Sequence, residues 1–250
     1  MESLLVCIAY YNTLSDNYLK IIIERFKSYN MNIHIIVDTN SNINLNIDAE
    51  VFVYNLNHPY HLTWMHRKHF LDNINNYDWF MYMEDDMDVP FENFEMYMEN
   101  FKLLWPNYIP SFVRVEKFND KEFNSDNLSR QIPHIFKIKD KKFTTIGNAY
   151  HAFWIMSKNE LKETMIDNFV RYEISRETAA SYPTWELNKI PLLMMENNQI
   201  SSLCYSYHLS NKYAASPDSP FGKIEMNNLL YDFNGKDSNI DNPLMITINR

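Results

Sequence analysis

The chain has 250 residues, of which 46% are hydrophobic and 15% aromatic, and this is enough apolar material to bury one sizeable core. The composition excludes a disordered chain, and the net charge of −9 argues against a nucleic-acid-binding surface, which would need clustered lysine and arginine. The two cysteines, Cys7 and Cys204, both fall in predicted buried strands and do not indicate a disulfide framework.

The N-terminal segment predicts a first strand and not a targeting signal. Its apolar run is short and is preceded by no basic residues, whereas a signal peptide needs both a basic start and a longer apolar region. No segment approaches the roughly 20 apolar residues of a membrane-spanning helix. We therefore expect a soluble protein with no membrane span in a reducing compartment, the cytoplasm.

Strands alternate with helices in the first half of the chain. The predicted elements are strands at 4–10, 32–37 and 51–56, a helix capped by Ser15 or Asp16, a helix opening at Thr63, and an apolar strand after Tyr77. This order is typical of an α/β fold with a mostly parallel central sheet flanked by helices, in which ligands bind at the carboxyl ends of the strands.

The second half predicts a smaller, mixed β element. An amphipathic helix over 91–105 ends before Pro106, and short strands follow near 112–115 and in a hairpin of 135–139 with 143–146. The remaining predicted elements are a strand at 150–156, a helix opened by a capping box at Ser157-Lys158-Asn159-Glu160, a helix opening at Thr184 that Pro191 bends or restarts, and a last strand at 200–207. Because no linker or repeat interrupts the chain, we predict a single domain.

The most informative segment is the apolar strand that follows Tyr77 and runs directly into acidic residues. Its four carboxylates are those of Glu84, Asp85, Asp86 and Asp88. Carboxylate oxygens suit Mg²⁺ or Mn²⁺, and such ions usually complete their coordination shell with substrate phosphates. The alternative is helix capping, and Asp88 before Pro90 does fit a helix start. One cap leaves the other three carboxylates unexplained, so we favour a metal site.

An α/β half that ends in an acidic strand terminus, followed by a mixed half with a late histidine, resembles the GT-A glycosyltransferases. These enzymes carry a short acidic motif, Asp-x-Asp or a Glu-Asp-Asp variant, that holds Mn²⁺ or Mg²⁺ on a nucleotide-sugar diphosphate. Glu84-Asp85-Asp86 matches the variant and Asp86-Met87-Asp88 matches the literal form, so the register is open, although the position directly after the strand favours the first. The resemblance covers roughly residues 3–213.

The resemblance implies one GT-A-like domain with a nucleotide-binding half at 1–106, an acceptor and catalytic half at 107–213, and a polar tail at 214–250. It makes Asp86 the direct metal ligand, with Glu84 or Asp85 facing the ribose or the donor sugar. His208 would complete the metal shell; the alternative is a surface loop histidine.

Three further assignments follow from the resemblance. Tyr10 would stack on the base, although simple packing at the strand end is the alternative, and Asp38 would accept a hydrogen bond from the ribose or base. Arg67 would reach the diphosphate, because the guanidinium fork suits phosphate oxygens. Four histidines also lie close together in the sequence, at positions 58, 61, 66 and 69, but their spacing matches no standard zinc pattern and we expect them to pack.

Sugar transfer with inversion needs a general base, and Glu186 matches the place of the catalytic carboxylate in inverting GT-A enzymes. The alternative is a glutamate in the first turn of a helix that complements the helix dipole.

The function that we expect is a metal-dependent glycosyltransferase that moves a sugar from a nucleotide-diphosphate sugar, with a UDP-sugar favoured, to a glycan or other hydroxyl acceptor. A sugar-phosphate nucleotidyltransferase is one alternative, but the chain has only 3 glycines and so no glycine-rich phosphate loop at the first strand. A non-catalytic carbohydrate-binding protein is the other, and the intact acidic cluster argues against it.

Overall fold

The computed structural model describes residues 1–11, 16–41, 47–148, 152–165, 167–232 and 245–248. The chain is of the mixed α/β class, as predicted, with more strand than helix. It divides into two compact units, one of Met1–Met87 with Ala152–Leu187 and one of Asp88–His151 with Asn188–Arg250. These units do not follow the predicted halves of the sequence, because the first unit takes up a segment from the middle of the second half.

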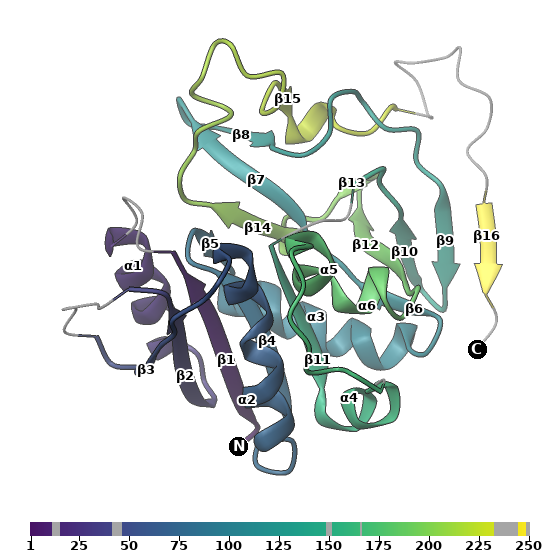
Figure 1. Cartoon of the computed structure of the whole chain (residues 1–250). Helices are drawn as coiled ribbons and strands as arrows, with labels where there is room; N and C mark the ends of the chain where they lie inside the picture. The colour runs from purple at the N-terminus through teal and green to yellow at the C-terminus, as the bar shows by residue number, and fades with distance from the viewer. Residues whose placement is uncertain (12–15, 42–46, 149–151, 166, 233–244, 249–250) are drawn as a thin grey trace. The chain divides into compact units, whose positions relative to one another are not determined.

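The first unit contains a five-stranded sheet that is mostly parallel. In spatial order its strands are β11 (Phe153–Ser157), β4 (Trp79–Glu84), β1 (Ser3–Tyr10), β2 (Asn32–Thr39) and β3 (Glu50–Val53). Four strands run in parallel and β11 alone runs antiparallel, against β4 (Figure 1). Both β1 and β4 are continuous apolar runs buried along almost their whole length, which is the pattern expected of strands covered on both faces.

The first unit also contains helical segments. They are α1 (Asp16–Lys27), the 3₁₀ helix η1 (Pro59–Trp64), α2 (His66–Asp72), α4 (Lys158–Thr164), α5 (Arg176–Ala180) and α6 (Tyr182–Trp185). In α1 the apolar residues Leu19, Ile22, Ile23 and Phe26 share one buried face, as their spacing predicts. No helix within the described ranges is long and apolar enough to cross a membrane.

The predicted capping box at the start of α4 is not formed. Ser157 occupies the N-cap position, but its side chain makes no capping hydrogen bond. The N–H of Lys158 instead donates to the carbonyl of Asp78 (2.8 Å), so the neighbouring strand end satisfies a donor in the first turn. The helix ends at Thr164.

The second unit contains one long helix, α3 (Phe91–Leu104), and two sheets. One sheet has the order β13 (Gln199–Ile200), β12 (Ile190–Glu196), β10 (Lys141–Thr144), β9 (Ile135–Ile138) and β16 (Met245–Ile248), and β6 (Tyr108–Pro110) pairs with β12. The other has the order β15 (Ile224–Glu225), β8 (Lys121–Asn124), β7 (Val113–Phe118), β14 (Tyr205–His208) and β5 (Met87–Asp88), and Met87 of β5 is the last residue of the first segment of the first unit. The short 3₁₀ helices η2 (Ser202–Cys204) and η3 (Met226–Asn228) complete the unit. The predicted hairpin is confirmed as β9 and β10.

Three local predictions are wrong. The helix predicted from Thr184 through Pro191 ends at Trp185, and Pro191 lies in β12. The apolar run of β12 adopts a strand because Leu192 joins a buried cluster with residues of α3, β9 and β10. Asp88 does not cap α3: the N-cap residue is Pro90, and Asp88 lies in β5. Cys204, although buried, lies in η2 and not in a strand.

Candidate functional site

The order in which the chain adds strands to the first sheet reverses between β1 and β4. From β1 the chain adds β2 and then β3 on one side, and it then places β4 on the other side of β1. In open α/β sheets, ligands bind outside the carboxyl ends of the strands at such a switch point. The strands that meet here end at Tyr10 and Glu84. We call the residues around this point, Tyr11, Glu84, Asp85, Asp86 and Arg176, the strand-end site.

Glu84 is held by an arginine that the sequence analysis did not identify. The Nε of Arg176 donates to Oε1 of Glu84 (2.9 Å), and Nη2 donates to Oε2 (2.6 Å). Glu84 is only 4% exposed, whereas the Arg176 side chain is 36% exposed. This bidentate pair offsets the negative charge of the acidic strand end. A weak sequence signal exists, since an arginine in the first turn of a helix is unfavourable for the helix dipole unless it has a partner elsewhere.

Asp85 joins the ends of β1 and β4. Its Oδ2 accepts a hydrogen bond from the backbone N–H of Tyr11 (3.3 Å), and the residue is buried. Burial raises the pKa of the Tyr11 hydroxyl well above its usual range, and the charges of Glu84 and Asp85 add to this rise while Arg176 opposes it. Asp86 is more exposed than Glu84 or Asp85. The strand-end site is therefore an acidic edge with one bound guanidinium.

The strand-end site suits a cation that arrives with an anionic ligand better than a cage made of protein alone. Among the described residues, no group of three or more His, Cys, Asp or Glu side chains is arranged to hold a metal ion. Mg²⁺ and similar ions are, however, commonly held by one or two carboxylates and complete their shell with phosphates and water. The hard oxygens of Asp85 and Asp86 fit that second kind of site, whereas both oxygens of Glu84 are already bonded to Arg176.

Asp38 lies at the same edge, at the end of β2. Asp38 and Glu84 are both in register with Ala9 of the strand between them. The carboxylate of Asp38 pairs with Nε2 of His69 (2.9 Å), which also contacts the hydroxyl of Tyr54 (3.1 Å). Burial raises the pKa of Asp38, and the hydrogen bond to His69 opposes the rise. These contacts favour a role in joining β2 to α2, and a role in binding ribose stays a prediction.

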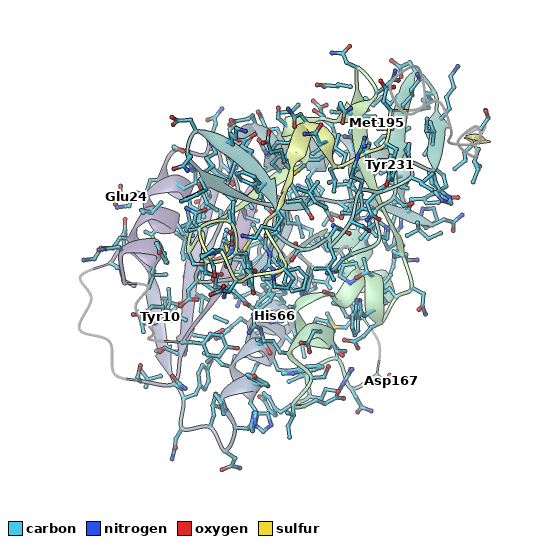
Figure 2. All side chains as sticks on the ribbon, turned by 90° about the horizontal axis from the view of Figure 1, so that it is seen from above. Tyr10, Glu24, His66, Asp167, Met195 and Tyr231 are labelled. Atoms are coloured by element: carbon cyan, nitrogen blue, oxygen red, sulfur yellow. The ribbon has the colours of Figure 1, made fainter. Side chains whose placement is uncertain are left out.

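The geometry favours packing over base stacking for Tyr10. Its side chain is fully buried at the end of β1. Tyr10 is labelled in Figure 2. The predicted packing of the histidines is seen at two of them. His66 is buried against Tyr82, with 4.1 Å between ring centroids, and Nε2 of His69 contacts the carboxylate of Asp38.

Arg67 and Glu186 meet, but inside the first unit and not at the strand-end site. Arg67 is fully buried; its guanidinium donates to Oε1 of Glu186 and, through Nη1, to the carbonyl of Phe169 (3.2 Å). Its guanidinium carbon lies 4.3 Å from the ring centroid of Trp64. Arg171 binds the other oxygen of Glu186 (2.8 Å). A buried guanidinium with these partners favours a structural role over contact with a diphosphate.

The helix position predicted for Glu186 is also wrong. Glu186 is the C-cap residue of α6 and does not lie in the first turn of a helix, so it cannot complement a helix N-terminus. Its two oxygens face two guanidinium groups, which leaves it poorly placed to take a proton from an acceptor.

His208 belongs to the second unit, at the end of β14. It is not a surface histidine, because its side chain is fully buried against Glu116. The metal-ligand role stays a prediction.

Comparison with models of known protein families gives no match, and neither does comparison with curated protein sequences.

Proposed function

We propose that this chain is a metal-dependent glycosyltransferase with a GT-A-like arrangement that uses a nucleotide-diphosphate sugar, with a UDP-sugar favoured, and a hydroxyl acceptor. The observation that carries the proposal is the position of Glu84-Asp85-Asp86 at the switch point of a mostly parallel sheet, beside the end of β1. A doubly wound sheet binds its ligand at this point, and an acidic edge there needs a cation before a diphosphate can approach.

The residues of the strand-end site have different roles in this proposal. Asp86 binds the cation, because its carboxylate is the most exposed of the three, and Asp85 fixes the chain after β1 through the N–H of Tyr11. Arg176 neutralises Glu84 at the edge that receives the phosphates. When bound, the Mn²⁺ or Mg²⁺ would neutralise the leaving diphosphate. We assign no general base, since Glu186 is engaged by Arg67 and Arg171.

The test is donor binding with and without metal. Thermal unfolding of the purified chain should be measured with UDP-, GDP- and CMP-sugars, each in Mn²⁺ and in chelator. A ligand that binds only the folded state stabilises it by about 2.7 kcal/mol at a concentration of one hundred times Kd. We expect one donor class to raise the melting temperature in Mn²⁺ only.

The matched variants are Asp86→Asn and Asp72→Asn. Asp72 is an exposed aspartate of the same unit that pairs with Lys68, so its substitution should leave the donor effect unchanged. Asp86→Asn should abolish the effect. If no donor raises the melting temperature in Mn²⁺, or if the rise persists in chelator, the proposal is wrong.

A further inference from the structure

The hairpin of β7 and β8 lines a groove in the second unit. The groove has a volume of about 810 Å³, which is within the range that ligand sites occupy. Residues 117–122 of the hairpin line it together with Tyr205, Glu225 and Met226, and all of these belong to the second unit. The groove is therefore formed without any residue of the strand-end site.

Strand pairing fixes the backbone around the groove. β7 and β8 pair in antiparallel fashion up to Phe118 and Lys121, and β15 pairs with the other edge of β8. The turn residues Asn119 and Asp120 are both left-handed, with φ of 51° and 58°, as in a tight type I′ hairpin turn. A ligand would thus meet a backbone that is already ordered, which lowers the entropy cost of binding.

The lysines of the groove each face a carboxylate. Nζ of Lys121 donates to Oε1 of Glu225 (2.6 Å), and Nζ of Lys117 lies 3.5 Å from Oε1 of Glu122. A fifth charged residue, Asp120, also lines the groove. Phosphate groups are bound by cationic side chains or helix N-termini that have charge to offer. The paired lysines and the additional aspartate therefore disfavour a phosphate ligand.

A hydroxyl is the uncharged group that fits such an ion pair. Its oxygen can accept a hydrogen bond from the ammonium while its hydrogen is donated to the carboxylate, so it joins the pair without adding charge. A purely apolar ligand would instead take the charged groups out of water without replacing their hydrogen bonds. The two pairs favour a ligand with several hydroxyl groups.

The groove also presents an aromatic ring. Phe118 is 39% exposed at the end of the hairpin, whereas Tyr205 and Met226 are buried and contribute little accessible surface. A sugar ring carries C–H groups on its faces and hydroxyl groups around its rim. It can therefore pack one face on an aromatic ring while its hydroxyls reach polar neighbours.

We propose that this groove binds an uncharged carbohydrate, with one sugar face on Phe118 and hydroxyl groups bonded to the two lysine–glutamate pairs. The binding needs neither the cation nor the nucleotide of the proposed function, so it goes beyond that function and does not rest on it.

The experiment measures binding in chelator and without nucleotide. The purified full chain is titrated with three trisaccharides, those of α-linked glucose, β-linked glucose and N-acetylglucosamine, and saturation-transfer NMR detects binding. Methionine labelled with ¹³C in its methyl group gives a second readout, because Met226 lines the groove. We expect a trisaccharide to bind and to shift the Met226 signal, which Met226→Leu identifies. The signal of Met81, in β4 of the first unit, should not move.

Two substitutions in the groove should weaken binding of that trisaccharide about tenfold. Phe118→Ala removes the stacking surface, and Lys121→Met removes a donor to a hydroxyl. Leu128→Ala is the matched control for the first, because Leu128 is an exposed apolar residue of the same unit outside the groove lining. Lys27→Met is the control for the second, because Lys27 is an exposed lysine paired with Glu24 in the first unit. Both controls should leave the affinity unchanged.

The inference is overturned if no trisaccharide binds in chelator, if either groove variant binds as the wild type does, or if the Met226 signal does not shift at saturation. Asp86→Asn should bind the trisaccharide like the wild type, and loss of binding in that variant would assign the sugar to the strand-end site instead. Trisaccharide binding in a chain that binds no donor in Mn²⁺ would leave the groove standing and overturn only the proposed function.

Discussion

His66 is a residue whose protonation works against folding. Its Nδ1 donates to the carbonyl of Thr63 (2.8 Å), and within the described part of the chain Nε2 has no hydrogen-bond partner. Burial lowers the pKa of His66 well below its usual range, and the charge of Arg67 lowers it further. The folded chain therefore keeps this ring neutral at a pH where the unfolded chain protonates it.

The pH dependence of stability follows from that difference. As pH falls below about 6.5, the unfolded state binds a proton that the folded state excludes, so the free energy of unfolding falls by up to about 1.4 kcal/mol per pH unit. His66→Phe keeps the stack on Tyr82 and should remove this part of the slope between pH 7 and pH 5. Urea unfolding at several pH values measures it, with His61→Gln as the control. An unchanged slope in His66→Phe would show that another group is responsible.

The two registers of the acidic motif, Glu84-Asp85-Asp86 and Asp86-Met87-Asp88, predict different effects of substitution at Asp88. Asp86→Ala should abolish turnover in either register, whereas Asp88→Ala should matter only if Asp88 binds the metal. Because Pro90 is the N-cap residue of α3, Asp88→Ala should also lack the loss of about 0.5–2 kcal/mol that removal of a helix cap causes. We expect turnover near wild type for Asp88→Ala. Loss of turnover in a well-folded protein would assign the motif to Asp86-Met87-Asp88.

At the scale of elements, Glu186 joins segments that are distant in the sequence. It binds Arg67 of α2 and Arg171, and Arg67 also bonds to the carbonyl of Phe169. We expect Glu186→Gln to destabilise the fold by about 3–5 kcal/mol, because it leaves a buried guanidinium without its counter-charge. Transfer rates below the melting transition should stay near wild type.

The measurement compares chemical denaturation with transfer rates for the same Glu186→Gln preparation. Glu173→Gln, at an exposed partner of Arg171, is the control for loss of a surface charge. A fall in kcat of roughly 10²–10⁴ with unchanged stability would instead restore Glu186 as a general base.

Local sequence patterns predicted the elements whose secondary structure depends least on contacts with distant parts of the chain. The strands β1, β2 and β4 and the buried face of α1 follow from apolar runs and helical spacing, and the ends of these strands located the strand-end site. The helix predicted from Thr184 through Pro191 failed because β12 is set by its pairing with β10 and β6. The Arg176–Glu84 and Glu116–His208 pairs join residues far apart in the sequence, and no local pattern identifies such partners.

At the scale of the whole molecule, both units are discontinuous in sequence. The first unit is completed only by β11, whose residues Phe153, Trp154, Ile155 and Met156 are all buried. A fragment of residues 1–106, the predicted nucleotide-binding half, lacks this strand. We expect it to show no cooperative thermal transition and no near-ultraviolet circular dichroism of the native kind, unlike the full chain. A cooperative transition in the fragment would contradict the discontinuous unit.

The distance between β4 and β11 in the sequence also imposes an order on biosynthesis. A ribosome synthesises β4 long before β11. At typical elongation rates, the edge of β4 that later pairs with β11 therefore stays unpaired for on the order of ten seconds. An unpaired apolar edge invites pairing with the same strand of a neighbouring nascent chain. The carboxylates of Glu84, Asp85 and Asp86 at the end of that edge would repel their own copies, as charged gatekeeper residues do beside aggregation-prone strands. The acidic residues of the strand-end site would thus also protect the nascent chain from aggregation.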